Sequence, residues 1–178
     1  MKKLNIFLAC LVGLMTFAAC ESDRDDNPTL VQPADGSFVL NTPAFAGNTY
    51  DLEYSKSLEL SCSQPDYGFT AATTYSVEVS LDESFASSEV LSTVYTTARM
   101  NVDASEFAVA ATNLAVAEGM TEDMFPYVGN VYVRVNAKLQ DGIGEITSNI
   151  IELPNVKFYF ALPPVKKPTE LFLIGGFC

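Results

Sequence analysis

Residues 131–139 read VYVRVNAKL, and every second residue in this stretch is apolar. Val131, Val133 and Val135 would lie on one side of an extended strand, and the polar residues between them on the other. Because side chains alternate across a strand, this pattern is typical of a β-strand with one face on a core and one face in water. It is the longest alternating run in the sequence, and it predicts a β protein.

Three further stretches alternate in the same way. Their inward-facing residues are expected to be Leu58, Leu60 and Cys62; Tyr75, Val77, Val79 and Leu81; and Val156, Phe158, Phe160 and Leu162. Glu78 and Ser80 are expected to face water. Turn-forming residues separate the stretches, for example at 64–68 and 82–84. Many short strands without alternating helices predict an all-β, antiparallel β-sandwich over residues 36–162.

One segment has helical spacing. Asp103 and Glu106 are placed as in a capping box, in which the first side chain accepts from the backbone and the second reaches back. The residues that come next at helical spacing are Phe107, Ala111, Leu114 and Glu118. Gly119 ends the run. The sequence therefore predicts one short crossover helix laid across the sandwich.

The N-terminus has the layout of a bacterial lipoprotein signal. Two lysines precede an apolar stretch over residues 4–17, and two alanines stand directly before Cys20. The apolar stretch is shorter than the roughly 20 residues that a membrane-spanning helix needs. We expect residues 1–19 to be a cleaved signal peptide, Cys20 to be lipidated, and residues 20–35 to form an acidic tether. A plain secretory signal with a coincidental cysteine is the alternative.

Composition excludes several classes of function. The chain has 22 acidic and 10 basic residues, and loss of two lysines with the signal leaves a mature charge of 8 minus 22, or −14. Phosphate backbones would repel such a chain, so no nucleic-acid partner is expected. The sequence contains no histidine, which excludes Ser-His-Asp and Cys-His catalysis. No paired-cysteine spacing predicts a metal site, and Cys62 is expected to be a buried apolar residue.

No set of residues predicts an enzyme or a cofactor site. The carboxylate pairs Glu21/Asp23 and Glu122/Asp123 are expected to be solvated, because acid–base catalysis needs a buried group facing a cleft. Residues 141–145 have the glycines of a hairpin turn and lack the ligand spacing of a calcium loop. Without tryptophan, the candidates for a contact surface are Tyr67, Tyr95, Tyr127 and Tyr159.

The C-terminal residues differ in character from the sandwich. Residues 163–169 (PPVKKPT) are expected to form a stiff, Pro-rich linker. Residues 170–178 begin a fresh apolar strand, which cannot bury itself and is expected to be the start of a truncated second domain. The alternative is that this strand pairs back onto an edge of the first domain.

Several of these segments resemble known families. Residues 132–137 with Asp141–Glu145, and residues 74–85, resemble strands of fibronectin type III-like and immunoglobulin-like domains. The lipoprotein cysteine with its acidic run, the turn at 64–68 and Asn101-Val102-Asp103 are together similar to the SusE/SusF family of starch-utilisation lipoproteins. The apolar residues 171–177 look like the opening strand of that family's glycan-binding modules.

The resemblance implies a non-enzymatic lipoprotein of the outer membrane, facing the cell surface beside a glycan transporter. Its immunoglobulin-like domain would be a spacer that holds downstream glycan-binding modules away from the membrane. Oligosaccharide would be bound only through those modules. The alternative is a protein-interaction module that docks on a transporter or partner lipoprotein and binds no carbohydrate; a hydrolase ranks below both.

Overall fold

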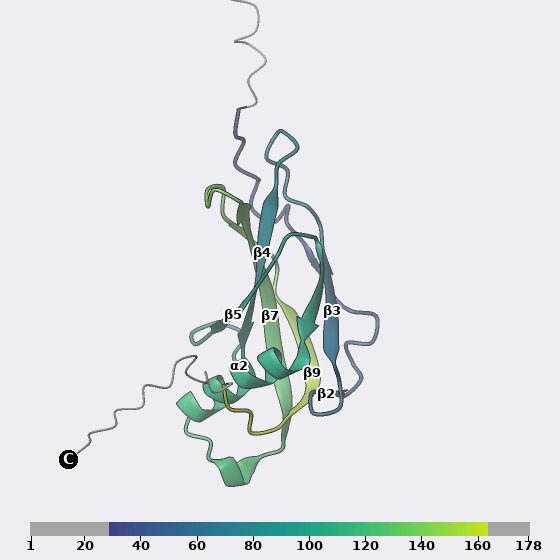
Figure 1. The fold of residues 1–178 in the computed structure, drawn as a ribbon, viewed down its shortest axis with the longest axis vertical. Coiled ribbons are helices and arrows are strands. Elements are labelled where there is room, and N and C mark those ends of the chain that lie inside the picture. Colours follow the sequence, from purple (N-terminus) through teal and green to yellow (C-terminus); the bar gives the residue numbers. More distant parts are fainter. Residues whose placement is uncertain (1–28, 164–178) are drawn as a thin grey trace, which may run out of the picture.

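The computed structural model describes residues 29–163, and the long strands run along the longest axis of the molecule (Figure 1). The expected signal peptide, Cys20, most of the Pro-rich linker and residues 170–178 lie outside the described residues.

Two β-sheets make up the described part of the chain. The smaller sheet has the strand order β1-β3-β6, and the larger has the order β2-β9-β7-β4-β5, with the short β8 paired to β7. The strands of the smaller sheet are β1 (Leu40–Asn41), β3 (Ser57–Cys62) and β6 (Arg99–Asp103). Those of the larger sheet are β2 (Tyr50–Asp51), β4 (Thr73–Ser80), β5 (Glu89–Tyr95), β7 (Tyr127–Leu139), β8 (Ile146–Thr147) and β9 (Ile151–Phe158). The prediction of a mainly β fold is confirmed.

β7 is the central strand of the larger sheet and contains the alternating run 131–139. It pairs antiparallel with β4, so that Leu139 at its end lies opposite Thr73. On its other side it pairs antiparallel with β9, so that Tyr127 at its start lies opposite Phe158. At roughly 3.3 Å per residue, the 13 residues of β7 span about 40 Å.

One edge of the larger sheet differs from the expectation. β2 pairs with β9 in parallel, with Tyr50 opposite Val156, so the prediction of a purely antiparallel arrangement is wrong at this edge. A strand of two residues is too short to carry an alternating pattern, and periodicity therefore gave no sign of it.

The two sheets and the helix α2 (Ala104–Ala117) enclose one hydrophobic core. The inward residues of β3, β4, β7 and β9 are buried as the alternation predicted, and Cys62 is among them. Burying one Val, Leu or Phe side chain stabilises a fold by about 1.5–3 kcal/mol, so the alternating residues contribute substantially to the apolar driving force. The predicted inward residues beyond the strand ends are exceptions: Leu81 and Phe160 are only half-buried, and Leu162 is 70% exposed, because β4 ends at Ser80, β9 ends at Phe158 and the period is lost beyond them.

The polar face of β4 is the second exception. Glu78 is 5% exposed and Ser80 is fully buried, although the alternation predicted that both would face water. The segment between β4 and β5 folds back over this face: the Ser80 hydroxyl oxygen lies within hydrogen-bonding distance of the carbonyl oxygens of Asp82 and Ser87, at 2.8 and 2.6 Å. Periodicity shows which face of a strand is polar but not whether a loop covers it.

Helix α2 connects β6 of the smaller sheet to β7 of the larger one, as expected of a crossover helix. The Asp103 side chain caps its N-terminus by accepting from the backbone N–H groups of Ser105 and Glu106. Gly119 follows the helix at φ +96°, a conformation that favours glycine. The second half of the expected capping box is wrong, because the Glu106 carboxylate does not return to Asp103 but bonds β5.

The chain enters the described domain at one end of β7. The N–H of Val31 donates to the carbonyl of Tyr67 at 3.0 Å, and the Gln32 side chain donates to the carbonyl of Glu145 at 3.0 Å. Tyr67 precedes β4, and Glu145 follows β7. Both contacts therefore lie at the end of the sheet where β4 begins and β7 finishes.

The chain leaves the described domain at the opposite end. The Thr112 hydroxyl of α2 donates to the carbonyl of Tyr159 and accepts from the N–H of Ala161, at 3.0 and 3.2 Å. These residues follow Phe158, which lies opposite the first residue of β7. Figure 1 shows the first described residues at the top and the last ones beside α2 in the lower part of the molecule.

Candidate functional site

The most strongly connected charged group in the described residues is the carboxylate of Glu78 on β4. The Arg134 guanidinium on β7 binds it through two hydrogen bonds, Nε to Oε2 at 2.7 Å and Nη2 to Oε1 at 2.8 Å. The Ser88 hydroxyl donates to Oε1 at 2.6 Å, and the Asn136 amide donates to Oε2 at 2.9 Å. Arg134 and Glu78 meet because they are directly opposite each other in the β4–β7 pairing.

An aromatic ring covers the other side of the guanidinium. The Arg134 guanidinium carbon lies 4.3 Å from the centre of the Phe85 ring, a cation–π distance. Phe85 has φ +53°, which a non-glycine residue rarely adopts, and the turn that it forms places its ring over the sheet. The loop between β4 and β5 thus covers this ion pair.

The Glu78 cluster is unsuited to acid–base catalysis. Burial raises the pKa of Glu78, but the hydrogen bonds from Arg134, Ser88 and Asn136 lower it to about 2. The carboxylate is therefore ionised at neutral pH, and both of its oxygens already accept hydrogen bonds. A general acid or base needs a pKa near the working pH and access to a substrate proton. The cluster connects β4 with β7 and with the covering loop.

A groove of about 690 Å³ lies between the edge strand β5 and helix α2. Its apolar lining includes Leu91 from β5, Val109 and Ala110 from α2, and Leu162 from the last described segment. Three carboxylates also line it, Glu89, Asp103 and Glu106, and no lysine or arginine of the described part of the chain does so.

Glu106 links the two walls of this groove. Its carboxylate accepts from the Ser92 hydroxyl at 2.6 Å, the Thr93 N–H at 2.8 Å and the Thr93 hydroxyl at 2.7 Å. Burial raises the pKa of Glu106, but these hydrogen bonds lower it overall. β5 is an edge strand, and Glu106 satisfies one backbone donor that such an edge leaves unpaired.

The tyrosines named from the sequence do not form one surface. Tyr67 is 1% exposed, so its prediction as a candidate for a contact surface is wrong; its ring packs against the 139–144 turn. Tyr95 and Tyr159 are half-buried against the core. Tyr127 is 39% exposed, and its ring packs edge-on against Phe158 at 5.6 Å between centroids.

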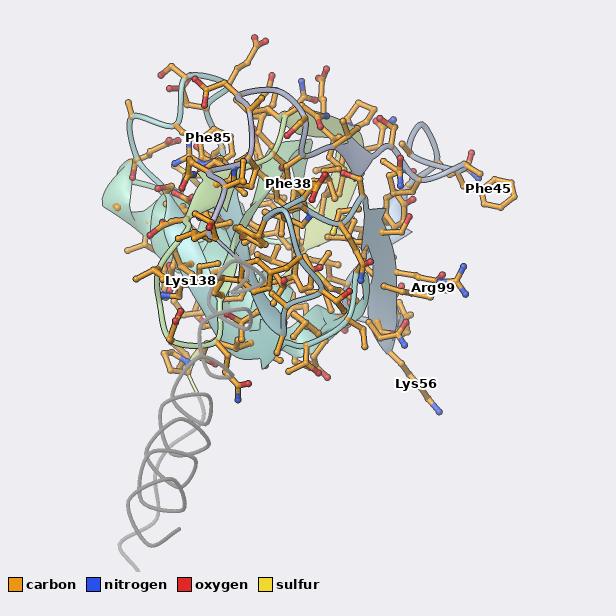
Figure 2. The ribbon with its side chains drawn as sticks, turned by 90° about the horizontal axis from the view of Figure 1, so that it is seen from above. Phe38, Phe45, Lys56, Phe85, Arg99 and Lys138 are labelled. Carbon is orange, nitrogen blue, oxygen red and sulfur yellow. The ribbon has the colours of Figure 1, made fainter. Side chains whose placement is uncertain are left out.

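Two exposed aromatic residues were missed. Phe45 is 70% exposed and Tyr54 is 79% exposed. Figure 2 shows Phe45 projecting away from the body of the domain, whereas Phe38 lies within it. Both missed residues lie in loops beside β2, outside any alternating run, so periodicity gave no prediction for them. The available signal was an aromatic residue among turn-forming or polar neighbours: Phe45 lies between Pro43 and Gly47, and Tyr54 lies between Glu53 and Ser55.

Within residues 29–163, no group of three or more His, Cys, Asp or Glu side chains could hold a metal ion. No helix in this part of the chain is long and apolar enough to cross a membrane. Glu122 and Asp123 lie in a 3-10 helix (Glu122–Met124) and are exposed, while Glu21 and Asp23 lie outside the described residues.

The SusE outer membrane protein family matches residues 22–136, which is more than half of the chain. This chain belongs to the SusE family. The match confirms the resemblance drawn from the lipoprotein cysteine region, the 64–68 turn and the 101–103 segment. It includes β1 to β6, all of α2 and the first ten residues of β7, and therefore both partners of the Glu78–Arg134 pair.

As a SusE family member, the chain is an outer membrane protein and is linked to glycan-utilisation systems. SusE proteins are non-catalytic surface proteins, in agreement with the expectation drawn from composition. Cys20, the predicted lipid site, lies before the matched segment and outside the described residues.

Proposed function

We propose that this SusE protein is a lipid-anchored spacer at the cell surface. Cys20, freed by removal of residues 1–19, carries the lipid, and residues 20–35 are the acidic tether. The two sheets form an immunoglobulin/fibronectin-III-like sandwich over residues 36–162. Two or more acyl chains make such an anchor stable, whereas the −14 charge of the mature chain gives no electrostatic attraction to an anionic membrane.

The observation that carries this proposal is the position of the two ends of the domain. Val31 is held where β7 finishes, and Ala161 is held near its start, so about 40 Å of sheet separates them. A domain that the chain enters and leaves at the same end would add little height above a membrane. In this domain the chain enters at one end and leaves at the other, and the anchor at Cys20 is nine residues before Thr29. The domain therefore holds any downstream module well away from the lipid.

The proposal extends to the modules that the spacer serves. Residues 163–169 are a linker, and residues 170–178 are the start of the glycan-binding modules. Those modules bind the oligosaccharide. The anchored assembly would lie beside an outer-membrane glycan transporter. In this arrangement the described domain makes no sugar contact of its own, and its function depends on its length and its rigidity.

The anchor is tested by Cys20→Ala in the producing cell. We expect the variant to leave the outer-membrane fraction, whereas Cys178→Ala, a cysteine substitution at the other end of the chain, stays in it. Retention of Cys20→Ala in that fraction would contradict the anchor. Antibody access to the domain in intact cells tests the surface orientation, and labelling only after permeabilisation would contradict it.

The exposed aromatics favour a second candidate, a module that docks on the transporter or a partner lipoprotein. Phe45 and Tyr54 border the same edge of the larger sheet: the Asn155 side chain donates to the carbonyl of Gly47, and Lys157 lies 5.8 Å from the Tyr54 ring. Isolation of the native complex with Phe45→Ser and Tyr54→Ser separates the two functions. A spacer keeps its partners in both variants, whereas a docking module loses them.

A further inference from the structure

The groove between β5 and α2 lies where the described chain ends. Residues 159–163 line it, and Leu162 within this segment is 70% exposed. The chain beyond Pro163 therefore starts at the rim of the groove. A tethered segment has an effective concentration in the millimolar range for a site within its reach, so even weak contacts can hold it there.

The walls of the groove present apolar surface together with negative charge. Val90 of β5 is 53% exposed, and Leu162 of the last described segment is 70% exposed. Among residues 29–163, the charged residues that line the groove are Glu89, Asp103 and Glu106. Asn113 donates to Glu89 at 2.8 Å, and the other two carboxylates accept from the helix N-terminus and from β5, so all three are fixed in position.

The six residues after Pro163 have the complementary composition. They read PVKKPT, with one apolar residue, Val165, followed by Lys166 and Lys167. Lys166 is three residues beyond Pro163, so at up to about 3.5 Å per residue its backbone is within roughly 10 Å of the groove lining. Two of the eight basic residues of the mature chain thus follow within four residues of Pro163, the last described residue of a groove whose described lining has three carboxylates and no basic side chain.

We propose that this groove is the docking site of the chain's own residues 164–169. Val165 packs between Val90 and Leu162, and the two lysines lie against the carboxylates of Glu89, Asp103 and Glu106. Docking fixes the direction in which the chain leaves the domain. The inference concerns the described domain and its linker alone and does not depend on lipidation of Cys20 or on glycan binding.

Thiol labelling can test the docking on the mature chain carrying Cys20→Ser and Cys178→Ser. Val90→Cys places a thiol in the groove, and Val94→Cys places one of similar exposure (56%) on the same strand outside it. The native Cys62 does not interfere, because burial raises its pKa to about 11. Lys166→Gln with Lys167→Gln removes two positive charges, and Lys138→Glu changes the net charge equally at an exposed position on β7.

We expect the double lysine variant to label about three times faster than its parent at position 90 and at an unchanged rate at position 94. Lys138→Glu should leave both rates unchanged, and 0.5 M salt should reproduce the effect of the double variant. Equal rates at position 90 with and without the two lysines would overturn the proposal. A rate at position 90 that falls as protein concentration rises would assign the groove to a second copy of the chain instead.

Discussion

The Arg134 guanidinium holds the Glu78 carboxylate in a bidentate ion pair, with nitrogen–oxygen distances of 2.7 and 2.8 Å. The side chain of Glu78 is 7% exposed and that of Arg134 is 30% exposed, so water competes little for the carboxylate. The pair connects the two central strands of the larger sheet. If the domain acts as a rigid spacer, this is one of the contacts that keeps the sheet stiff.

Glu78→Gln should lower the free energy of unfolding by about 2 kcal/mol, because it leaves a partly buried guanidinium without its counter-charge. The matched control is Glu59→Gln, which breaks the Arg99–Glu59 pair, whose side chains are 76% and 59% exposed. That change should cost less than about 0.5 kcal/mol. Urea unfolding of both variants measures the difference, and equal costs would contradict a structural role for the buried pair.

Stability should depend on the protonation of Glu78. The pKa of Glu78 in the folded protein is about 2, below the ordinary 4.5. The contribution of Glu78 to the free energy of unfolding is therefore fully present above pH 4.5 and is lost as pH falls through 2. The difference in unfolding free energy between the wild type and Glu78→Gln should therefore be constant from pH 7 to 5 and shrink from pH 4.5 to 2. If the difference in unfolding free energy stays constant down to pH 2.5, the pair with Arg134 does not keep the Glu78 carboxylate ionised.

The N-terminus of α2 depends on one side chain. Asp103→Ala should lower the free energy of unfolding by about 1 kcal/mol, because the N–H groups of Ser105 and Glu106 lose their acceptor. Asp103→Ser retains an acceptor and should recover most of this loss. Thermal and urea unfolding of the three proteins measure the effect. If serine is no better than alanine, capping is not what Asp103 contributes.

Two glycines in one turn give a matched test of packing at the end of the domain where β7 finishes. Gly142 and Gly144 both have positive φ, at +92° and +68°, but a Cβ on Gly144 would lie 2.7 Å from Cε1 of the buried Tyr67, while one on Gly142 would meet nothing within 4 Å. Gly142→Ala should cost about 1 kcal/mol and Gly144→Ala roughly 1–3 kcal/mol more. Equal losses in urea unfolding would mean that the Tyr67 ring moves aside.

Alternation predicted those elements whose burial follows from the strand alone. The run at 131–139 became the central strand β7, and Cys62 was correctly placed in the core. Glu78 was wrongly placed in water because the loop after β4 covers the ion pair: Ser88 donates to the Glu78 carboxylate, and the Phe85 ring lies over Arg134. A strand period contains no information about such a covering segment.

The helix shows the same division between local and tertiary information. The Asp103 cap depends on neighbours two and three residues away, and the sequence predicted it. Glu106 had the local spacing for a capping box, but two hydroxyls and an N–H on β5 offered its carboxylate three hydrogen bonds instead. Which partner it takes depends on how α2 packs on the sheet. The groove and its charges depend on that same packing, so they could not be predicted from the order of residues alone.

The most direct test of the spacer compares the heights of the two ends of the domain above the membrane. In lipidated protein carrying Cys178→Ser, a fluorophore is placed on Ile143→Cys or Leu162→Cys, which are 51% and 70% exposed. Energy transfer to acceptor lipids in vesicles then reports the distance of each label from the bilayer. The account predicts that the label at 143 lies near the bilayer and the label at 162 lies farther out, by up to about 40 Å. Equal transfer from both labels would show that the domain lies flat, and would contradict its role as a spacer.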